Sequence, residues 1–223
     1  MELGLTHTTA WPWITLLALG AFHGLNPGMG WLFAVALGMQ EQSRAAVWRA
    51  LGPLALGHGL AIAAAILVAV AAGAVIPMQY LRWPVALLLI AMGVSRFYRH
   101  RHPRWAAMRV SGPRLTVWSF LMASAHGAGL MVLPVFLHMT TVQAATDAEN
   151  CHTLAAGGAS ASGPMTGLLA TLVHGAGYLL VTAFIAWIVF EKLGVGLLRQ
   201  AWVNLDLIWA AALIVTGGVT LLL

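Results

Sequence analysis

Four histidines, each followed directly by a glycine, recur along a strongly apolar chain: His23, His58, His126 and His174. Neutral imidazole is the commonest transition-metal ligand among side chains, and it also relays protons near neutral pH. Because an ionisable group inside a membrane is costly, such residues tend to mark a pathway for an ion or a substrate. The four histidines therefore predict a metal or proton site, and the alternative for each is a hydrogen bond that joins two packed helices.

The first histidine stands beside a break in an otherwise apolar stretch, AFHGLNPGMGW. Pro27 has no amide proton and Gly28 loosens the following turn, so we expect a helix broken at Asn26-Pro27-Gly28. The carbonyl groups freed there need partners, which a membrane allows only in a protein interior or a hydrated cavity. Asn26, three residues after His23, is expected on the same helical face, and Met29 adds a thioether. The stretch predicts half of an ion or substrate site, with a proline kink in a packed helix as the alternative.

The composition assigns these residues to a membrane protein. Of 223 residues, 61% are hydrophobic and 8% are charged, and the mean hydropathy is +0.87, which no ordinary soluble domain shows. A transmembrane helix needs about 20 apolar residues. We therefore predict an all-α integral membrane protein, a single membrane domain over 1–223 with about six transmembrane helices. The apolar segments cover 13–39, 52–76, 83–97, 115–139, 165–190 and 203–223.

The formal net charge of +5 follows from membrane topology. Ten of the eleven basic residues fall in three connections that six spans place on one side, among them the basic connection 99–114. Positive charge marks the cytoplasmic side, so both termini are expected outside, in a bacterial inner membrane. The segment 141–164, with the single cysteine Cys151, is expected as an outer loop. The expected partners are the lipid bilayer and a metal ion; nucleic acid is excluded, and a homo-oligomer or other membrane subunits are left open.

The histidines also divide the chain into two similar halves. The first and fourth spans contain AFHGLNPG and SAHGAGLM, and the second and fifth contain GHGLAIA and VHGAGYLL. We assign repeat 1 to about 11–98 and repeat 2 to about 115–223. Because each half has an odd number of spans, the second half enters the membrane from the opposite side. Such inverted repeats occur in many transporters, whose substrate sites lie near the midplane between the halves.

With HGLNPGMGW in the first span, GHG in the second and SAHGAG in the fourth, the chain resembles the NicO branch of the LysE-like transporter superfamily. These are nickel/cobalt permeases and efflux proteins of about six spans in two repeats, with a first-span motif of the form His-x-x-acidic-Pro-x-His. The resemblance implies that His23, Asn26, Met29 and His126 are metal-handling positions. Asn26 stands at the acidic position and Met29 at the second histidine. These departures remove negative charge and favour softer metals such as Cu(I).

We therefore predict a transporter, permease or exporter, of a transition-metal cation (Ni, Co or Cu) through a histidine-lined midplane site, with no tightly bound cofactor. The alternatives are a LysE-type exporter of a small organic solute and a non-transporting membrane subunit of a larger complex. An enzyme is not expected, because the chain has no GxSxG, no clustered histidine boxes and almost no carboxylates for acid–base chemistry. The predicted metal site comprises His23, Asn26, Met29, His58, His126 and His174.

The sequence also predicts where two further polar side chains of the spans lie. Asp206, flanked by Trp202 and Trp209, is expected at the membrane interface in an aromatic belt, with an inward-facing proton acceptor as the alternative. Tyr178, one turn after His174, is expected to point inward.

Overall fold

The structure is a computed structural model that describes residues 3–98, 112–150, 162–193 and 205–222. Within these ranges all regular secondary structure is helical. The elements are α1 (Leu3–Leu25), the 3₁₀ turn η1 (Pro27–Met29), α2 (Trp31–Gln40), α3 (Arg44–Gly73), α4 (Met78–Tyr98), α5 (Gly112–Ala125), α6 (Ala128–Asn150), α7 (Ser162–Ile188), the π-helical turn η2 (Val189–Leu193) and α8 (Leu205–Leu222).

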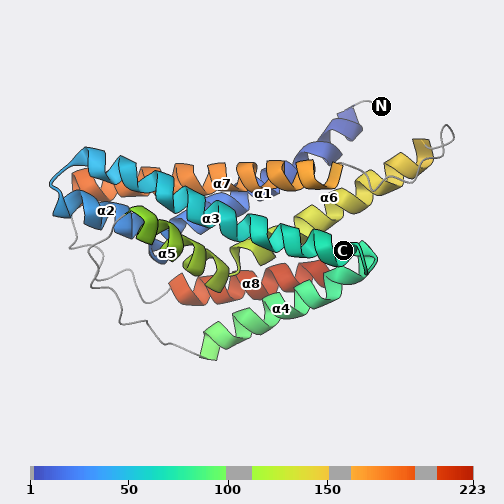
Figure 1. Cartoon of the computed structure of the whole chain (residues 1–223). Coiled ribbons are helices and arrows are strands. Elements are labelled where there is room, and N and C mark those ends of the chain that lie inside the picture. The colour runs from blue at the N-terminus through green and yellow to red at the C-terminus, as the bar shows by residue number, and fades with distance from the viewer. Residues whose placement is uncertain (1–2, 99–111, 151–161, 194–204, 223) are drawn as a thin grey trace.

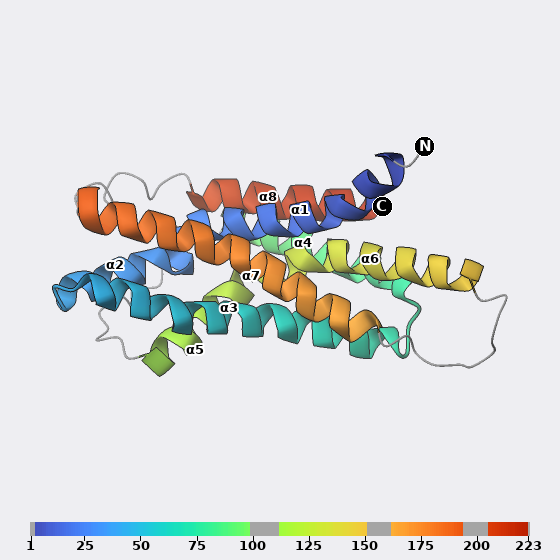
Figure 2. The ribbon, with the colours of Figure 1, turned by 90° about the horizontal axis from the view of Figure 1, so that it is seen from above.

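The helices form an elongated bundle, and the chain runs back and forth along its long axis (Figures 1 and 2). α1 and α2 run from the end that holds the N-terminus to the opposite end, α3 returns, and α4 runs back again (Figure 1). α5 with α6, then α7, then α8 take the reverse directions (Figure 1). Within the bundle α1 packs chiefly on α7, α3 on α5 and α4 on α8, while α3 also crosses α7.

The surface of the bundle is that of a membrane protein. Two helical stretches, Arg44–Gly73 and Pro164–Lys192, are long and apolar enough to cross a membrane. The pair Gly112–Ala125 and Ala128–Val142 qualifies as a third if it is taken as one bent span. Large apolar side chains lie on the outside, Val68 and Leu180 among them, at 69% and 68% exposure. Because water would make such exposure unfavourable, we take the protein to be a helical membrane protein.

The predicted break in the first helix is confirmed. α1 ends at Leu25, Asn26 has extended backbone angles, and η1 follows. Gly30, with φ 157°, then starts α2 in a conformation that other residues rarely adopt. A second break, which the sequence analysis did not predict, separates α5 from α6 at His126-Gly127. Gly127 has φ 74°, and the two helices bend by 63°.

The outer loop predicted over 141–164 is wrong at both of its edges. α6 continues to Asn150 and α7 already begins at Ser162. Alanine is frequent in VQAATDAEN, and a high helix propensity extends α6 beyond its apolar part. Cys151 and most of the basic connection 99–114 lie outside the described residues.

Candidate functional site

Three of the four His-Gly histidines meet inside the bundle. His23 on α1, His58 on α3 and His174 on α7 are each 0% exposed. Their ring centres are 5.6 Å apart for His23 and His58, 5.0 Å for His23 and His174, and 5.5 Å for His58 and His174. We call these three side chains the histidine cluster. The sequence prediction that histidines from different spans converge is thus met by three of the four.

Glycines at the crossing of α1 and α7 bring two of these histidines together. A β-carbon on Gly20 would lie only 1.9 Å from the carbonyl oxygen of His174, and one on Gly177 would lie 2.2 Å from that of Leu17. The two backbones therefore touch with no side chain between them, as small residues permit in membrane helices. This close crossing places His23 beside His174.

The ring nitrogens of the cluster are largely without hydrogen-bond partners. His23 Nδ1 is bonded to the Leu19 carbonyl of its own helix at 2.8 Å. His23 Nε2 and both nitrogens of His58 and His174 are buried and unpaired; the Leu16 carbonyl approaches the His174 ring without meeting hydrogen-bond geometry. Each unpaired buried polar group costs about 1–3 kcal/mol. Five such nitrogens at one place make the histidine cluster the candidate functional site.

The distances between the three rings are those expected around one metal ion, but the rings are not oriented to bind one. With metal–nitrogen bonds of about 2.0–2.1 Å, imidazoles around one tetrahedral ion have ring centres about 5 Å apart. The rings of His58 and His174 are nearly parallel, at 7°, and His23 stands edge-on to both. In the part of the chain that the structure describes, no group of three or more His, Cys, Asp or Glu side chains is arranged to hold a metal ion. Binding would require rotation of at least one ring.

His126 lies at the second break. Its Nδ1 is bonded to the Met122 carbonyl at 2.8 Å. The ring of Trp209, on α8, contacts both His126 and His23. Its centre is 5.8 Å from that of the His126 ring and 4.6 Å from that of the His23 ring. Trp209 also stacks on Phe22 at 4.9 Å. An aromatic wall therefore adjoins both His126 and the histidine cluster.

Two aromatic side chains, one from α7 and one from the start of α2, donate to carbonyls of the first break. The Tyr178 hydroxyl donates to the Met29 carbonyl at 2.7 Å, and Trp31 Nε1 donates to the Leu25 carbonyl at 3.1 Å. The expectation that the freed carbonyls find partners in the protein interior is confirmed. Tyr178 is 0% exposed, so its predicted inward direction is confirmed as well.

The second break is capped in the same manner. Trp209 Nε1 donates to the His126 carbonyl at 2.9 Å, and Arg96 donates to the Ala125 carbonyl at 2.8 Å. Trp209 is 3% exposed, so its assignment to an interfacial aromatic belt is wrong. The expectation was drawn from the depth of Asp206 in its span, and depth does not give the direction in which a neighbouring side chain points. The side chains of Trp202 and Asp206 lie outside those that the structure describes.

Asn26 and Met29 serve the break itself. Because α1 ends at Leu25, the prediction that Asn26 continues the helical face of His23 is wrong. The Asn26 amide oxygen accepts from the Gly28 amide at 2.9 Å, while its amide nitrogen is buried and unpaired. Met29 is 2% exposed within the apolar core. Their roles as metal ligands stay predictions.

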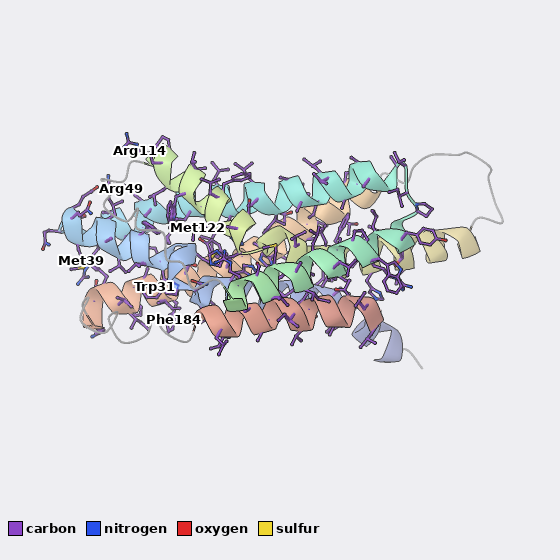
Figure 3. The ribbon with its side chains drawn as sticks, turned by 90° about the horizontal axis from the view of Figure 1, so that it is seen from below. Trp31, Met39, Arg49, Arg114, Met122 and Phe184 are labelled. Atoms are coloured by element: carbon purple, nitrogen blue, oxygen red, sulfur yellow. The ribbon has the colours of Figure 1, made fainter. Side chains whose placement is uncertain are left out.

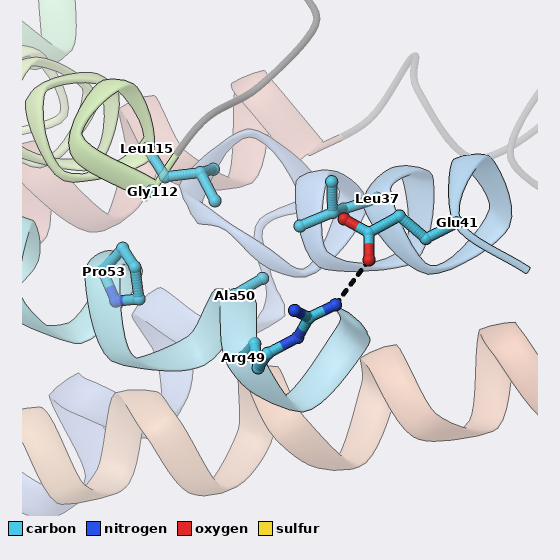
Figure 4. A pocket seen from close by; sticks show the side chains of 7 residues that line it. All are labelled: Leu37, Glu41, Arg49, Ala50, Pro53, Gly112 and Leu115. Atoms are coloured by element: carbon cyan, nitrogen blue, oxygen red, sulfur yellow. Dashed lines mark hydrogen bonds and ion pairs between the residues drawn. The ribbon is translucent and has the colours of Figure 1, made fainter. Parts of the chain in front are cut away.

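Two ion pairs lie at the end of the bundle that holds the α2–α3 turn. Arg49 pairs with Glu41 at 2.5 Å and Arg44 with Glu191 at 2.6 Å, and Arg114 lies at the same end (Figure 3). A pocket of about 230 Å³ opens beside the Arg49–Glu41 pair (Figure 4). It is lined by Leu37, Glu41, Arg49, Ala50, Pro53, Gly112 and Leu115.

Comparison of the chain with protein-family models, with curated proteins and with solved structures finds no match. The resemblance to the NicO branch therefore rests on the motif residues alone.

Proposed function

We propose that the protein is a membrane transporter that carries a transition-metal cation through the histidine cluster. The observation that carries this proposal is the convergence of three fully buried imidazoles from three helices, with five unpaired ring nitrogens. If these histidines only joined helices, their nitrogens would make hydrogen bonds between helices. The one ring hydrogen bond in the cluster that meets geometric criteria runs within α1.

The packing of the bundle supports two inverted repeats of three spans each. The contact of α1 with α7 has its counterpart in that of α5 with α3, and the contact of α2 with α7 in that of α6 with α3. These counterparts exchange each helix of the first half, α1 to α4, with the matching helix of the second half, α5 to α8. The same exchange turns the α3–α7 contact and the α4–α8 contact into themselves. The elements of the second half also run opposite to those of the first (Figure 1). Six spans follow if α1 with α2 and α5 with α6 are each one broken span.

Each repeat then begins with a broken span, and each break adjoins a histidine. Asn26 begins the first break three residues after His23, and His126 itself stands at the second. Interrupted helices near the midplane form the substrate sites of several transporter folds, because helix ends expose polar backbone groups there. The complete burial of the cluster corresponds to an occluded state, from which movement at either break would admit an ion from one side.

Flux measurements on the purified protein in lipid vesicles test the proposal. We expect His58→Ala to lower the flux of a transported transition-metal ion by about 10-fold or more, because one of three ligands is lost. His138→Ala is the matched control, since His138 is exposed on α6. Equal fluxes for wild type and His58→Ala would contradict the proposal. In that case a LysE-type solute exporter or a non-transporting subunit becomes the better account.

A further inference from the structure

The charges near the histidine cluster bear on the identity of the cargo, an inference that rests on the proposed transport function. The buried polar side chains that the structure describes are histidines, hydroxyls and one amide, with no carboxylate among them: His23, Asn26, His58, Ser119, His126, His174, Thr182 and Thr220. The two acidic side chains it describes, Glu41 and Glu191, pair with arginines at the basic end. The cluster therefore offers neutral donors.

Neutral donors discriminate strongly between ion charges. Moving a singly charged ion from water into a medium of low dielectric constant costs on the order of 20 kcal/mol before compensation. This cost rises with the square of the charge, so a divalent ion pays about four times as much as a monovalent ion of the same size. Negatively charged ligands recover part of this difference by neutralising the ion, and neutral imidazoles do not. The charge term alone therefore disfavours a divalent ion in this cluster relative to a monovalent one.

Hard oxygen donors near the cluster are mostly engaged in holding the bundle together. The Ser119 hydroxyl donates to the Leu54 carbonyl at 2.7 Å, and the Tyr178 hydroxyl donates to that of Met29. The Thr182 hydroxyl lies near that of Tyr178 without meeting hydrogen-bond geometry. The hydrogen bonds of Ser119 and Tyr178 fix the positions of their hydroxyl oxygens, which carry no negative charge, whereas hard divalent ions prefer carboxylate, carbonyl and water oxygens.

Soft thioether donors lie at both breaks. The Met92 sulfur lies 3.8 Å from the place that a β-carbon on Gly127 would take, and the Met122 methyl group lies at the same distance from that on Gly28. Met29 is itself part of the first break. Thioethers bind Cu(I) and other soft ions far better than Ni²⁺ or Co²⁺. A soft ion would therefore meet suitable ligands on its way to and from the cluster.

We infer that the cargo is a soft monovalent cation of the Cu(I) and Ag(I) class, held by the imidazoles of His23, His58 and His174, and that divalent ions are disfavoured. This assignment follows from the neutral charge of the cluster ligands and from the thioethers at the breaks.

Equilibrium binding to the purified full-length protein in detergent tests the inference, with Ag⁺ and Co²⁺ as probes and bound metal measured by mass spectrometry. A Cys151→Ser background removes the only thiol. We expect about one Ag⁺ per chain and Co²⁺ binding about 100-fold weaker or more. His58→Ala and His174→Ala should each weaken Ag⁺ binding by about 10-fold or more, and His138→Ala should leave it unchanged.

A second substitution keeps the test decisive if His58→Ala fails to fold. His58→Met replaces the imidazole with a soft thioether, so we expect it to retain Ag⁺ binding. Co²⁺ binding that depends on the same histidines and equals or exceeds that of Ag⁺ would overturn the inference and leave the proposed function standing. Ag⁺ binding that is unchanged in both His58→Ala and His174→Ala would overturn the inference as well. If neither ion binds and His58→Ala leaves vesicle flux unchanged, the inference and the proposed function both fail.

Discussion

Tyr178 connects the histidine cluster to the first break. Its ring stacks on that of His58, with centres 4.0 Å apart and planes within 9°. Its hydroxyl reaches from α7 to the carbonyl of Met29. A β-carbon on Gly30 would lie only 2.6 Å from this hydroxyl, so glycine at that position also leaves room for it. One side chain thus positions a cluster ring and holds the broken segment.

Tyr178→Phe isolates the second of these contributions. The variant keeps the aromatic ring but leaves the Met29 carbonyl without its donor, so we expect a loss of about 1–3 kcal/mol in the free energy of unfolding. Denaturant unfolding followed by tryptophan fluorescence measures it. Tyr80→Phe is the control, because Tyr80 is 56% exposed; its effect should stay within about 0.5 kcal/mol. Similar effects of the two substitutions would show that the hydrogen bond adds no stability.

At the scale of elements, the close α1–α7 crossing decides where two cluster histidines lie. Gly20 lies at this crossing with the His174 carbonyl directly against it. Gly175 lies on the same helix as His174, next to it in sequence, yet a β-carbon there would meet nothing within 4 Å. The two glycines therefore form a matched pair, one required by packing and one not.

Gly20→Ala should force the two helices apart and weaken metal binding together with stability. We expect a loss of about 1–3 kcal/mol from the forced backbone shift. Gly175→Ala should instead stabilise the protein by about 0.5–1 kcal/mol, because alanine favours a helix interior. Thermal unfolding and Ag⁺ binding of both variants check this. An unaltered Gly20→Ala protein would mean that the backbones do not touch in the working state.

Much of this arrangement was predictable at the level of elements. The lengths of the apolar segments predicted the helices. Pro27 and Gly28 predicted the first break, because each of these residues disfavours a helix through its own backbone properties. The second break was not predicted, since HGAG contains no proline and only the positive φ of Gly127 reveals the turn. The convergence of histidines from α1, α3 and α7 was expected from their repetition. The place of Trp209 depends on how α8 packs, and local sequence does not carry that information.

At the scale of the whole molecule, the described charges lie unevenly along the bundle axis. Exposed arginines and their acidic partners gather at the end with the α2–α3 turn, where Arg49 and Arg114 lie (Figure 3). The N-terminus lies at the opposite end (Figure 1). By the positive-inside rule we propose that the arginine-rich end faces the cytoplasm. An accessibility measurement can test this proposed orientation.

Labelling of single cysteines in intact cells tests this orientation. We expect a membrane-impermeant maleimide to label native Cys151, which the sequence assigns to the outer side. In a Cys151→Ser background, Gln40→Cys should be labelled only after permeabilisation, because Gln40 is exposed at the arginine-rich end. The reverse labelling pattern would show that the protein has the opposite orientation in the membrane. Labelling of both positions in intact cells would place the two connections on one side, which an odd number of spans between residues 40 and 151 forbids, and the inverted-repeat topology would then fail.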